Sequence, residues 1–300
     1  MGTKPIPTSI FTRIVSIAAL LCFVCSCGEK RREQPLAIDG IIDLSTWDFE
    51  KDGTVELKGE WRFAWQQLVD PIASKEFRSK FSQNIKVPGL WQKHSHPTIQ
   101  DTSLPGQGYA TYALEVWLPK TRPFKALGFV SAQAVSASTW RVLSIDAHDT
   151  LASIRQGIPG LSAEKTTPVH SEFFTTLDIG SRERILVMVQ VSNFYHARGD
   201  LRAGQIGTQE TLSAERVGKQ ALSAIIVGVL SIIALYHLIL FLQRREDLAP
   251  FYFACFSGVM GIRQWVMARF SQGMGQAWSV DGYKFFVALE YASLPLGVMS

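Results

Sequence analysis

Cysteine is scarce in this chain of 300 residues, and it is missing from the whole middle of the sequence. The four cysteines lie near the N-terminus and in one apolar stretch near the C-terminus; they are Cys22, Cys25, Cys27 and Cys255. The roughly 180 residues between these regions therefore cannot contain a disulfide. A domain of about 150 residues buries about 70% of its unfolded surface, so a hydrophobic core alone can stabilise this segment.

Long runs of positive charge and the common catalytic motifs are also missing. The net charge is only +4 and is spread along the chain, which argues against a nucleic-acid partner. The chain contains no Gly-x-Ser-x-Gly, His-Glu-x-x-His or phosphate-loop pattern. His94 and His96 have strand spacing for two metal ligands but lack a third. We therefore expect no catalysis, no metal and no cofactor.

Apolar residues dominate the C-terminal quarter. Residues 221–242 hold no formal charge and are followed closely by Arg244 and Arg245. About 20 apolar residues, rising 1.5 Å each, cross a hydrocarbon core of about 30 Å, so this run predicts a membrane-spanning helix. Residues 250–268 form a second apolar run, and 285–300 begin a third. We expect the first part of a helical transmembrane bundle, truncated within its third span.

Two ionisable residues fall within the second and third apolar runs. A charge at the centre of a span costs about 2.5–3.5 kcal/mol on insertion scales, so it usually faces a partner inside the bundle. Arg263 and Glu290 are therefore candidates for a pair that couples the two helices. The alternative is that Arg263 lies near a helix end and extends its guanidinium to the membrane surface.

The N-terminus predicts export. Residues 1–27 combine a basic start with an apolar segment that is short for a span, followed by small and polar residues. Residues 24–27 resemble a bacterial lipoprotein signal box, which makes Cys27 a candidate for lipidation. The alternative is an uncleaved anchor helix. Residues 28–35 form a polar tether, and export places the segment that follows on the outer side of the membrane.

Residues 36–212 show the alternation of apolar and polar residues that is typical of β-strands. The pattern is clearest over 109–118 and 184–192. Many short strands separated by Asp-Gly and Pro-Gly turns favour an antiparallel sandwich. A short helix is expected near 71–80. Residues 213–220 predict a linker helix that, if continuous with the first span, would carry a tilt of the sandwich to the membrane.

The acidic residues before the first long strand imitate the start of a calcium loop. Asp48, Glu50 and Asp52 have the alternating spacing of such a loop, and Gly53 follows them. The twelfth position is Gly59, which cannot supply the required carboxylate, and no helices flank the segment. We expect a charged turn instead.

Several motifs together resemble one receptor family. They are GEWRFAW at 59–65, VPGLW at 87–91, GYATY at 108–112, VSNFYHARG at 191–199, PFYF at 250–253, Arg263, and Glu290 with Tyr291. The β-rich motifs look like those of jelly-roll domains related to the sugar-binding modules of glycosidases. The arrangement over 38–300 resembles bacterial seven-transmembrane receptors with diverse intracellular signalling modules. The resemblance implies a mainly β, galactose-binding-like jelly-roll sandwich followed by an α-helical transmembrane bundle.

This resemblance also implies a function. The chain would be a fragment of a multi-pass receptor in the bacterial inner membrane, with its N-terminal domain on the periplasmic side binding a small molecule such as a carbohydrate. Family members continue into a cyclase, kinase or phosphatase module, which these residues do not include. Membrane lipid and a second copy of the chain are further expected partners. The alternatives are an accessory module of a membrane-anchored carbohydrate-active enzyme and a structural envelope protein.

Aromatic residues beside turns are the candidates for the ligand site. Trp91 and Tyr109 lie near Pro-Gly turns, where an aromatic face could stack on a sugar ring. Tyr195, His196 and Arg198 follow the last long predicted strand, and the guanidinium could bind a carboxylate or phosphate. The alternatives are that the large aromatics pack the core and that the loop is only solvated.

Overall fold

The computed structural model describes residues 32–70, 77–97, 99, 102–132, 136–145, 149–169, 172–271, 281, 284, 285 and 288. The predicted signal peptide with Cys27, most of the predicted tether and most of the third apolar run, including Glu290, lie outside these residues. All helices and strands named below belong to the unit Pro35–Ser300.

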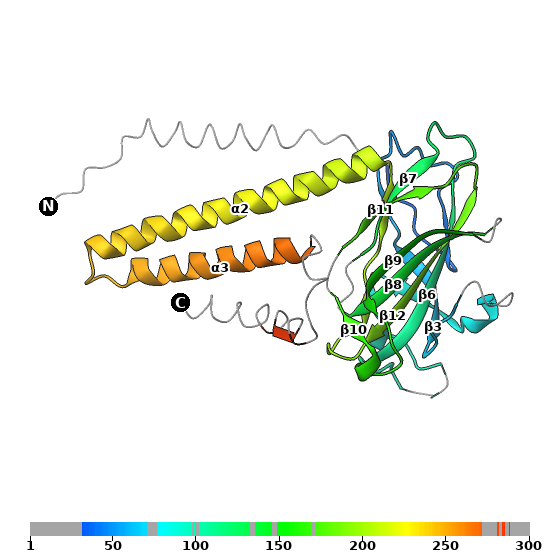
Figure 1. The fold of residues 1–300 in the computed structure, drawn as a ribbon, viewed down its shortest axis with the longest axis horizontal. Coiled ribbons are helices and arrows are strands. Elements are labelled where there is room, and N and C mark those ends of the chain that lie inside the picture. The colour runs from blue at the N-terminus through cyan, green and yellow to red at the C-terminus, as the bar shows by residue number, and fades with distance from the viewer. Residues whose placement is uncertain are drawn as a thin grey trace. The chain divides into compact units, whose positions relative to one another are not determined.

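The described residues up to 208, here called the β-domain, are mostly β-sheet (Figure 1). The larger sheet has the strand order β10-β9-β8-β12-β6-β3-β4, with β1 parallel to β6 and the other neighbours antiparallel. Its strands are β1 Ile41–Asp43, β3 Gly59–Trp65, β4 Gln83–Val87, β6 Gly108–Trp117, β8 Ala137–Ser144, β9 Thr150–Ile158, β10 Thr167–Pro168 and β12 Arg184–Asn193.

A smaller sheet has the order β11-β7-β14-β2, and β5 pairs with β13 by itself. These strands are β2 Val55–Glu56, β5 Gly89–Leu90, β7 Ala126–Val130, β11 Phe174–Asp178, β13 Asp200–Leu201 and β14 Gln205–Gly207. Short 3₁₀ turns occupy Phe77–Lys80, Trp91–Lys93 and Ala163–Lys165. Of the helix expected near 71–80, the described residues contain only the first of these turns.

The two strands predicted most clearly from alternation lie at the centre of the larger sheet. β6 and β12 pair in register over their whole length, from Gly108 opposite Asn193 to Trp117 opposite Arg184. The mainly β class expected from the sequence is therefore confirmed.

One core of apolar side chains joins the two sheets. Trp61 of β3 packs edge-on against Trp140 of β8, with ring centroids 6.4 Å apart. The ring centroid of Phe129, on β7 of the smaller sheet, lies 5.9 Å from that of Trp140. All three rings are fully buried. Because an aromatic side chain removes about 150–250 Å² from water, these rings supply much of the stabilisation that no disulfide provides.

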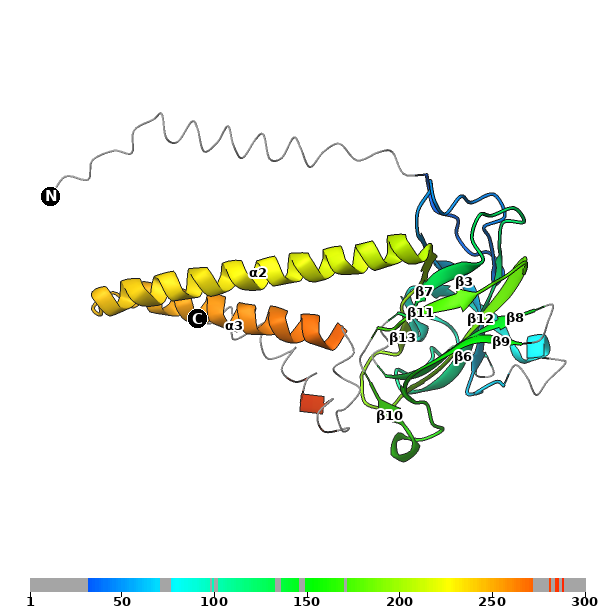
Figure 2. The same cartoon turned by 45° about the horizontal axis from the view of Figure 1, so that its top comes forward.

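Two helices follow the β-domain and lie side by side (Figure 2). Helix α2, Gln209–Gln243, is uninterrupted and includes both the predicted linker and the first predicted span. Thr208 caps its first turn by accepting a hydrogen bond from the Thr211 amide. Helix α3, Ala249–Ser271, returns along it, and the Gln264 side chain donates to Ser223.

Among the described residues, α2 is the one helix that is long and apolar enough to cross a membrane. The second predicted span, 250–268, falls within α3. Two helices do not make the multi-helix bundle that the sequence predicts, and the third span lies mostly outside the described residues.

Candidate functional site

The first turns of α2 are packed on the β-domain. Leu212 is 1% exposed and lies against β7. The Thr54 hydroxyl donates to the Glu215 carboxylate at 3.0 Å. The Arg216 guanidinium lies 5.4 Å from the centre of the Phe174 ring on β11. The helix is therefore tied to the smaller sheet by an apolar contact, a hydrogen bond and a cation–π contact before it reaches its apolar part.

Beside this contact lies a hollow of about 440 Å³ between the smaller sheet and α2, here called the α2 pocket. Its polar lining consists mainly of Glu56, Lys58, Ser131, Glu172, Arg202 and Lys219. These residues come from β2, β7, β11 and β14 or the loops next to them, and from α2. These residues are far apart along the chain and form no local motif, so the sequence gives no signal for the pocket.

The charges of the α2 pocket are partly paired with each other. Lys58 and Glu56 form an ion pair at 2.6 Å. The Glu172 carboxylate lies 4.0 Å from the Arg216 guanidinium. Burial raises the pKa of the Glu172 carboxyl above its ordinary value, although nearby Lys219 and Arg216 act in the opposite direction. Arg202 is exposed, and its positive charge acts on the carboxyl group of Asp200, whose pKa is raised mainly by burial.

The floor of the pocket is held by a buried polar network. The Gln156 side chain donates from Nε2 to Ser131 Oγ at 2.9 Å, and its Oε1 accepts from Ser138 Oγ at 2.6 Å and from Trp140 Nε1 at 2.9 Å. Gln156, Ser131, Ser138 and Trp140 are all fully buried. A satisfied network of this kind rigidifies its surroundings, so the pocket floor is fixed to the larger sheet.

The predicted ligand residues near the end of β12 are held in a turn built around Asn193. This residue is 1% exposed, and its Nδ2 donates to the backbone oxygens of Gly106, His196 and Arg198 at 2.8–2.9 Å. Its Oδ1 accepts from the His196 amide at 3.1 Å. One buried carboxamide thus determines the path of the whole turn.

Trp91 lies beneath this turn and is fully buried. Its Nε1 donates to the Pro105 oxygen at 2.7 Å, and its ring meets Trp65 edge-on at 5.3 Å. Gly199 lies directly against its indole. In this structure the indole packs the core, as the alternative interpretation stated, and presents no face to a ligand.

The other predicted ligand residues lie nearer the surface. The Tyr195 hydroxyl donates to the Ala163 oxygen at 2.7 Å. His196 Nδ1 lies 3.1 Å from both the backbone nitrogen and the oxygen of Arg198. Arg198 is exposed, and Tyr109 is half-buried on β6. The Tyr195 hydroxyl thus bonds to the 3₁₀ turn Ala163–Lys165, and His196 Nδ1 bonds within its own turn. A ligand-binding role for these four residues stays a prediction.

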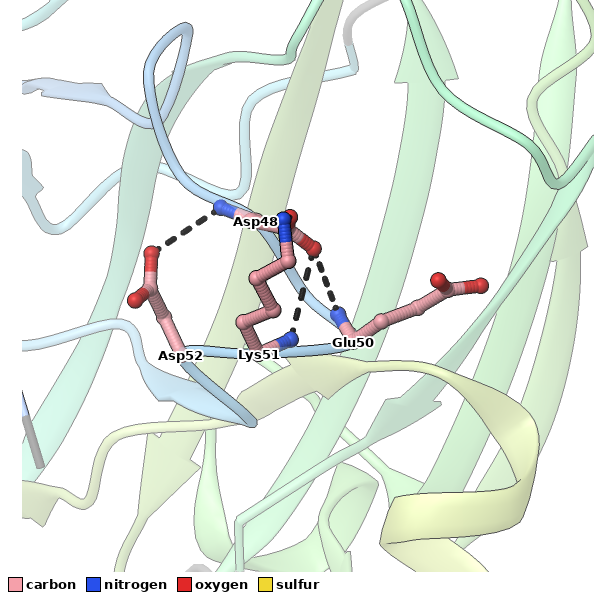
Figure 3. A network of polar contacts seen from close by, with 4 residues as sticks. All are labelled: Asp48, Glu50, Lys51 and Asp52. Carbon is pink, nitrogen blue, oxygen red and sulfur yellow. Dashed lines mark hydrogen bonds and ion pairs between the residues drawn. The ribbon is translucent and has the colours of Figure 1, made fainter.

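The acidic segment before β2 forms a closed turn (Figure 3). Asp48 Oδ1 accepts from the amides of Glu50 and Lys51, and the Asp48 amide donates to Asp52 Oδ2 at 3.1 Å. The Lys51 ammonium lies 3.1 Å from Asp48 Oδ2 and, as the main cause, lowers the pKa of that carboxyl. These contacts fit the charged turn that the sequence predicts.

The proposed intramembrane pair is described only in part. Arg263 lies half-buried in α3, and its Nε has no hydrogen-bond partner among the residues that the structure describes. Glu290 lies outside them. The pairing of these two residues therefore stays a prediction.

No family model matches this chain, and no curated protein with a similar sequence is found. Among solved structures, a β-glucuronidase of Faecalibacterium prausnitzii is 18% identical with a TM-score of 0.33, covering 48% of this chain and 21% of that enzyme. A Ruminococcus gnavus β-glucuronidase is 14% identical with a TM-score of 0.32, covering 51% and 28%. This chain thus spans less than a third of either enzyme. At TM-scores this low, we take neither the fold nor a function from the likeness.

Proposed function

We propose that this chain is the front part of a bacterial envelope receptor. A galactose-binding-like jelly-roll domain would lie outside the inner membrane and bind a small molecule, and a multi-pass helical part would carry the response inward to a signalling module. These residues themselves would catalyse no reaction. The observation that supports this proposal most strongly is that α2 is one helix, with its start packed on the smaller sheet and residues 221–242 uncharged.

A helix of this kind can carry a mechanical signal. Its 35 residues, at 1.5 Å each, extend over about 52 Å, of which residues 221–242 supply about 33 Å, enough for a hydrocarbon core of about 30 Å. A tilt of the smaller sheet would therefore reach the membrane without an intervening hinge. A ligand can bias two such orientations only by its different affinity for them.

The packing of α2 favours a receptor over a merely anchored module. An anchor requires only a tether, because its domain has no need of a fixed orientation to the membrane. Here Leu212, Glu215 and Arg216 all contact the β-domain. This arrangement supports coupling and gives an anchored enzyme accessory module or a structural envelope protein no comparable support.

Replacing Leu212 with alanine is expected to loosen this contact. Truncation of a fully buried leucine costs about 2–5 kcal/mol. Even 2 kcal/mol raises the fraction of molecules in which the helix start is detached from the β-domain about thirtyfold. Trypsin cleavage after Arg216 and Lys219, in the full chain in lipid nanodiscs, should accelerate by that factor. Val217→Ala, at a position 62% exposed on the same helix, is the matched control and should cleave at the unmodified rate. Equal cleavage of both variants would show that the helix start is not held by Leu212.

The receptor function itself is tested with the full chain in nanodiscs and a panel of neutral sugars, sugar acids and small carboxylates. Binding at a hundredfold excess over Kd adds about 2.7 kcal/mol to the stability of the folded state, which raises the unfolding midpoint by several degrees. A compound that does this and also changes amide exchange over 209–220 supports the receptor. A compound that binds and leaves exchange over 209–220 unchanged contradicts it.

A further inference from the structure

We propose that the α2 pocket binds a small anionic molecule through a carboxylate or phosphate group, and that Arg202 and Lys219 hold that group. The inference rests on the proposed receptor function and specifies the class of its ligand.

The balance of charge in the pocket favours an anion. Lys58 and Glu56 neutralise each other at 2.6 Å, so neither contributes much net charge. Glu172 lies 4.0 Å from Arg216, which also packs on the β-domain through the Phe174 ring. Arg202 and Lys219 are then left on the pocket wall, and the charge of Arg202 also acts on Asp200. Four cations thus face three carboxyl groups, and the excess charge is positive. Charge-assisted hydrogen bonds to a carboxylate or phosphate are about twice as strong as neutral ones, and a guanidinium can make two in parallel.

The size and the remaining lining of the pocket fit a small organic molecule. Its volume of about 440 Å³ lies within the range of about 300–1,000 Å³ that is usual for small-molecule sites. Pro88, Val130, Ala132 and Ala203 supply an apolar part of the wall. The pocket therefore offers cations for an acidic group and apolar surface for the rest of a ligand.

The two proposed anchoring cations come from different structural parts. Arg202 lies between β13 and β14, in the β-domain, whereas Lys219 lies on α2 two residues before the uncharged run 221–242. An anion held by both would connect the β-domain to the helix just outside the membrane. Such a ligand would bind best when the two parts are closest, which gives it the different affinity for two orientations that signalling needs.

Glu172 acts as a resident competitor for one of these two cations, Lys219. Its carboxylate faces Arg216 and Lys219 from α2, and the pocket wall also carries Glu56, Lys58 and Arg202. Burial raises the pKa of Glu172, so this carboxyl gains a proton at a higher pH than an exposed glutamate. Protonation removes a negative charge that repels the ligand. Affinity for an anion should therefore rise as the pH falls through the pKa of Glu172 and decrease above it.

The test uses the full chain in nanodiscs of uncharged lipid and titration calorimetry with three probes. Galacturonate carries a carboxylate where galactose has a hydroxymethyl group. Inorganic phosphate tests whether an oxyanion without a sugar ring is enough for binding. We expect galacturonate or phosphate to bind, and galactose to bind at least tenfold more weakly than galacturonate. Equal affinity for galactose and galacturonate, or no binding of either anion, would overturn the proposal.

Variants then assign the site. Arg202→Ala and Lys219→Ala should each weaken binding of the anion at least tenfold, whereas Glu172→Gln should tighten it at neutral pH and remove its pH dependence. Lys120→Ala is the matched control, because Lys120 is 78% exposed and lies outside the pocket lining. An unchanged unfolding midpoint in each variant excludes misfolding. Anion affinity that is the same in both cation variants as in the unmodified chain would overturn the assignment.

The outcome separates this inference from the receptor proposal. Galactose that binds as well as galacturonate and changes amide exchange over 209–220 would remove the anion site and leave the receptor. Galacturonate that binds through Arg202 and Lys219 without changing amide exchange over 209–220 would support the anion site and contradict the receptor proposal.

Discussion

Replacing Gln156 with leucine is expected to lower the free energy of unfolding of the β-domain by about 4 kcal/mol. Leucine has a similar volume, so the packing around position 156 is largely kept. The loss comes from Ser138 and Trp140, whose buried polar groups would each lose a hydrogen bond to Gln156. Ser131 keeps its hydrogen bonds with the backbone of Phe173. Leaving a buried group unsatisfied costs about 1–3 kcal/mol. Denaturant unfolding of the full chain, followed by tryptophan fluorescence, measures this loss.

The neighbouring position supplies the control. Arg155 precedes Gln156 in β9 and points to the opposite face, where it is exposed. Arg155→Leu should change the stability by no more than about 0.5 kcal/mol. A loss below 1 kcal/mol for Gln156→Leu would mean that water satisfies Ser138 and Trp140. The hydrogen bonds of Gln156 would then not be what makes the pocket floor rigid.

Gly199→Ala is the second change with a large expected effect. A Cβ at this position would lie 1.7 Å from Cε2 of Trp91, far inside contact distance. Neither group can move away easily, because the Gly199 oxygen accepts from the Trp91 amide at 3.0 Å and the Trp91 indole donates to Pro105. We expect a loss near the upper end of the usual overpacking range, about 3 kcal/mol, and a midpoint lowered by about 6–12 °C.

Gly218→Ala, in α2, is the same substitution with the opposite expected effect on stability. Nothing lies within 4 Å of a Cβ added there, so alanine should stabilise the helix by up to about 1 kcal/mol. Thermal unfolding should show a lower midpoint for Gly199→Ala and a higher midpoint for Gly218→Ala than for the unmodified chain. A Gly199→Ala variant as stable as the unmodified chain would contradict the placement of Trp91 beneath the turn.

The long strands were predictable because their side-chain pattern is strong. In β12, Val187 and Val189 face the main core, and between them Met188 belongs to a second apolar cluster on the other face of the sheet. Burial on both faces adds apolar residues to the second face, so the strand is predictable from the apolar residues at every second position of its core face, Ile185, Val187, Val189 and Val191, rather than from strict alternation. β5 and β13 contain two residues each, and two residues carry no periodicity. They form only because the chain brings Leu90 and Asp200 together.

The surroundings of the candidate ligand residues were harder to predict from the sequence. Trp91 lies beside a Pro-Gly turn, which suggests that its side chain is exposed. In the structure the turn after β12 covers the indole. This turn can lie so close because Gly199 has no Cβ to clash with the ring. The α2 pocket joins residues as distant as Lys58 and Lys219, so only the fold reveals it. The continuity of α2 could be stated as a hypothesis from the sequence, since Gly218 is tolerated within a helix at modest cost.

The proposed receptor requires that α2 fixes the orientation of the β-domain to the membrane. The most direct measurement is the distribution of distances between two spin labels, on Lys120→Cys and Leu242→Cys, in the full chain in nanodiscs with its native cysteines replaced by serine. We expect one narrow distribution, because the helix is continuous from Gln209 to Gln243 and its first turns are packed on the sheet. A broad distribution would show that the β-domain moves freely on its helix, and the proposed route for a signal would then be absent.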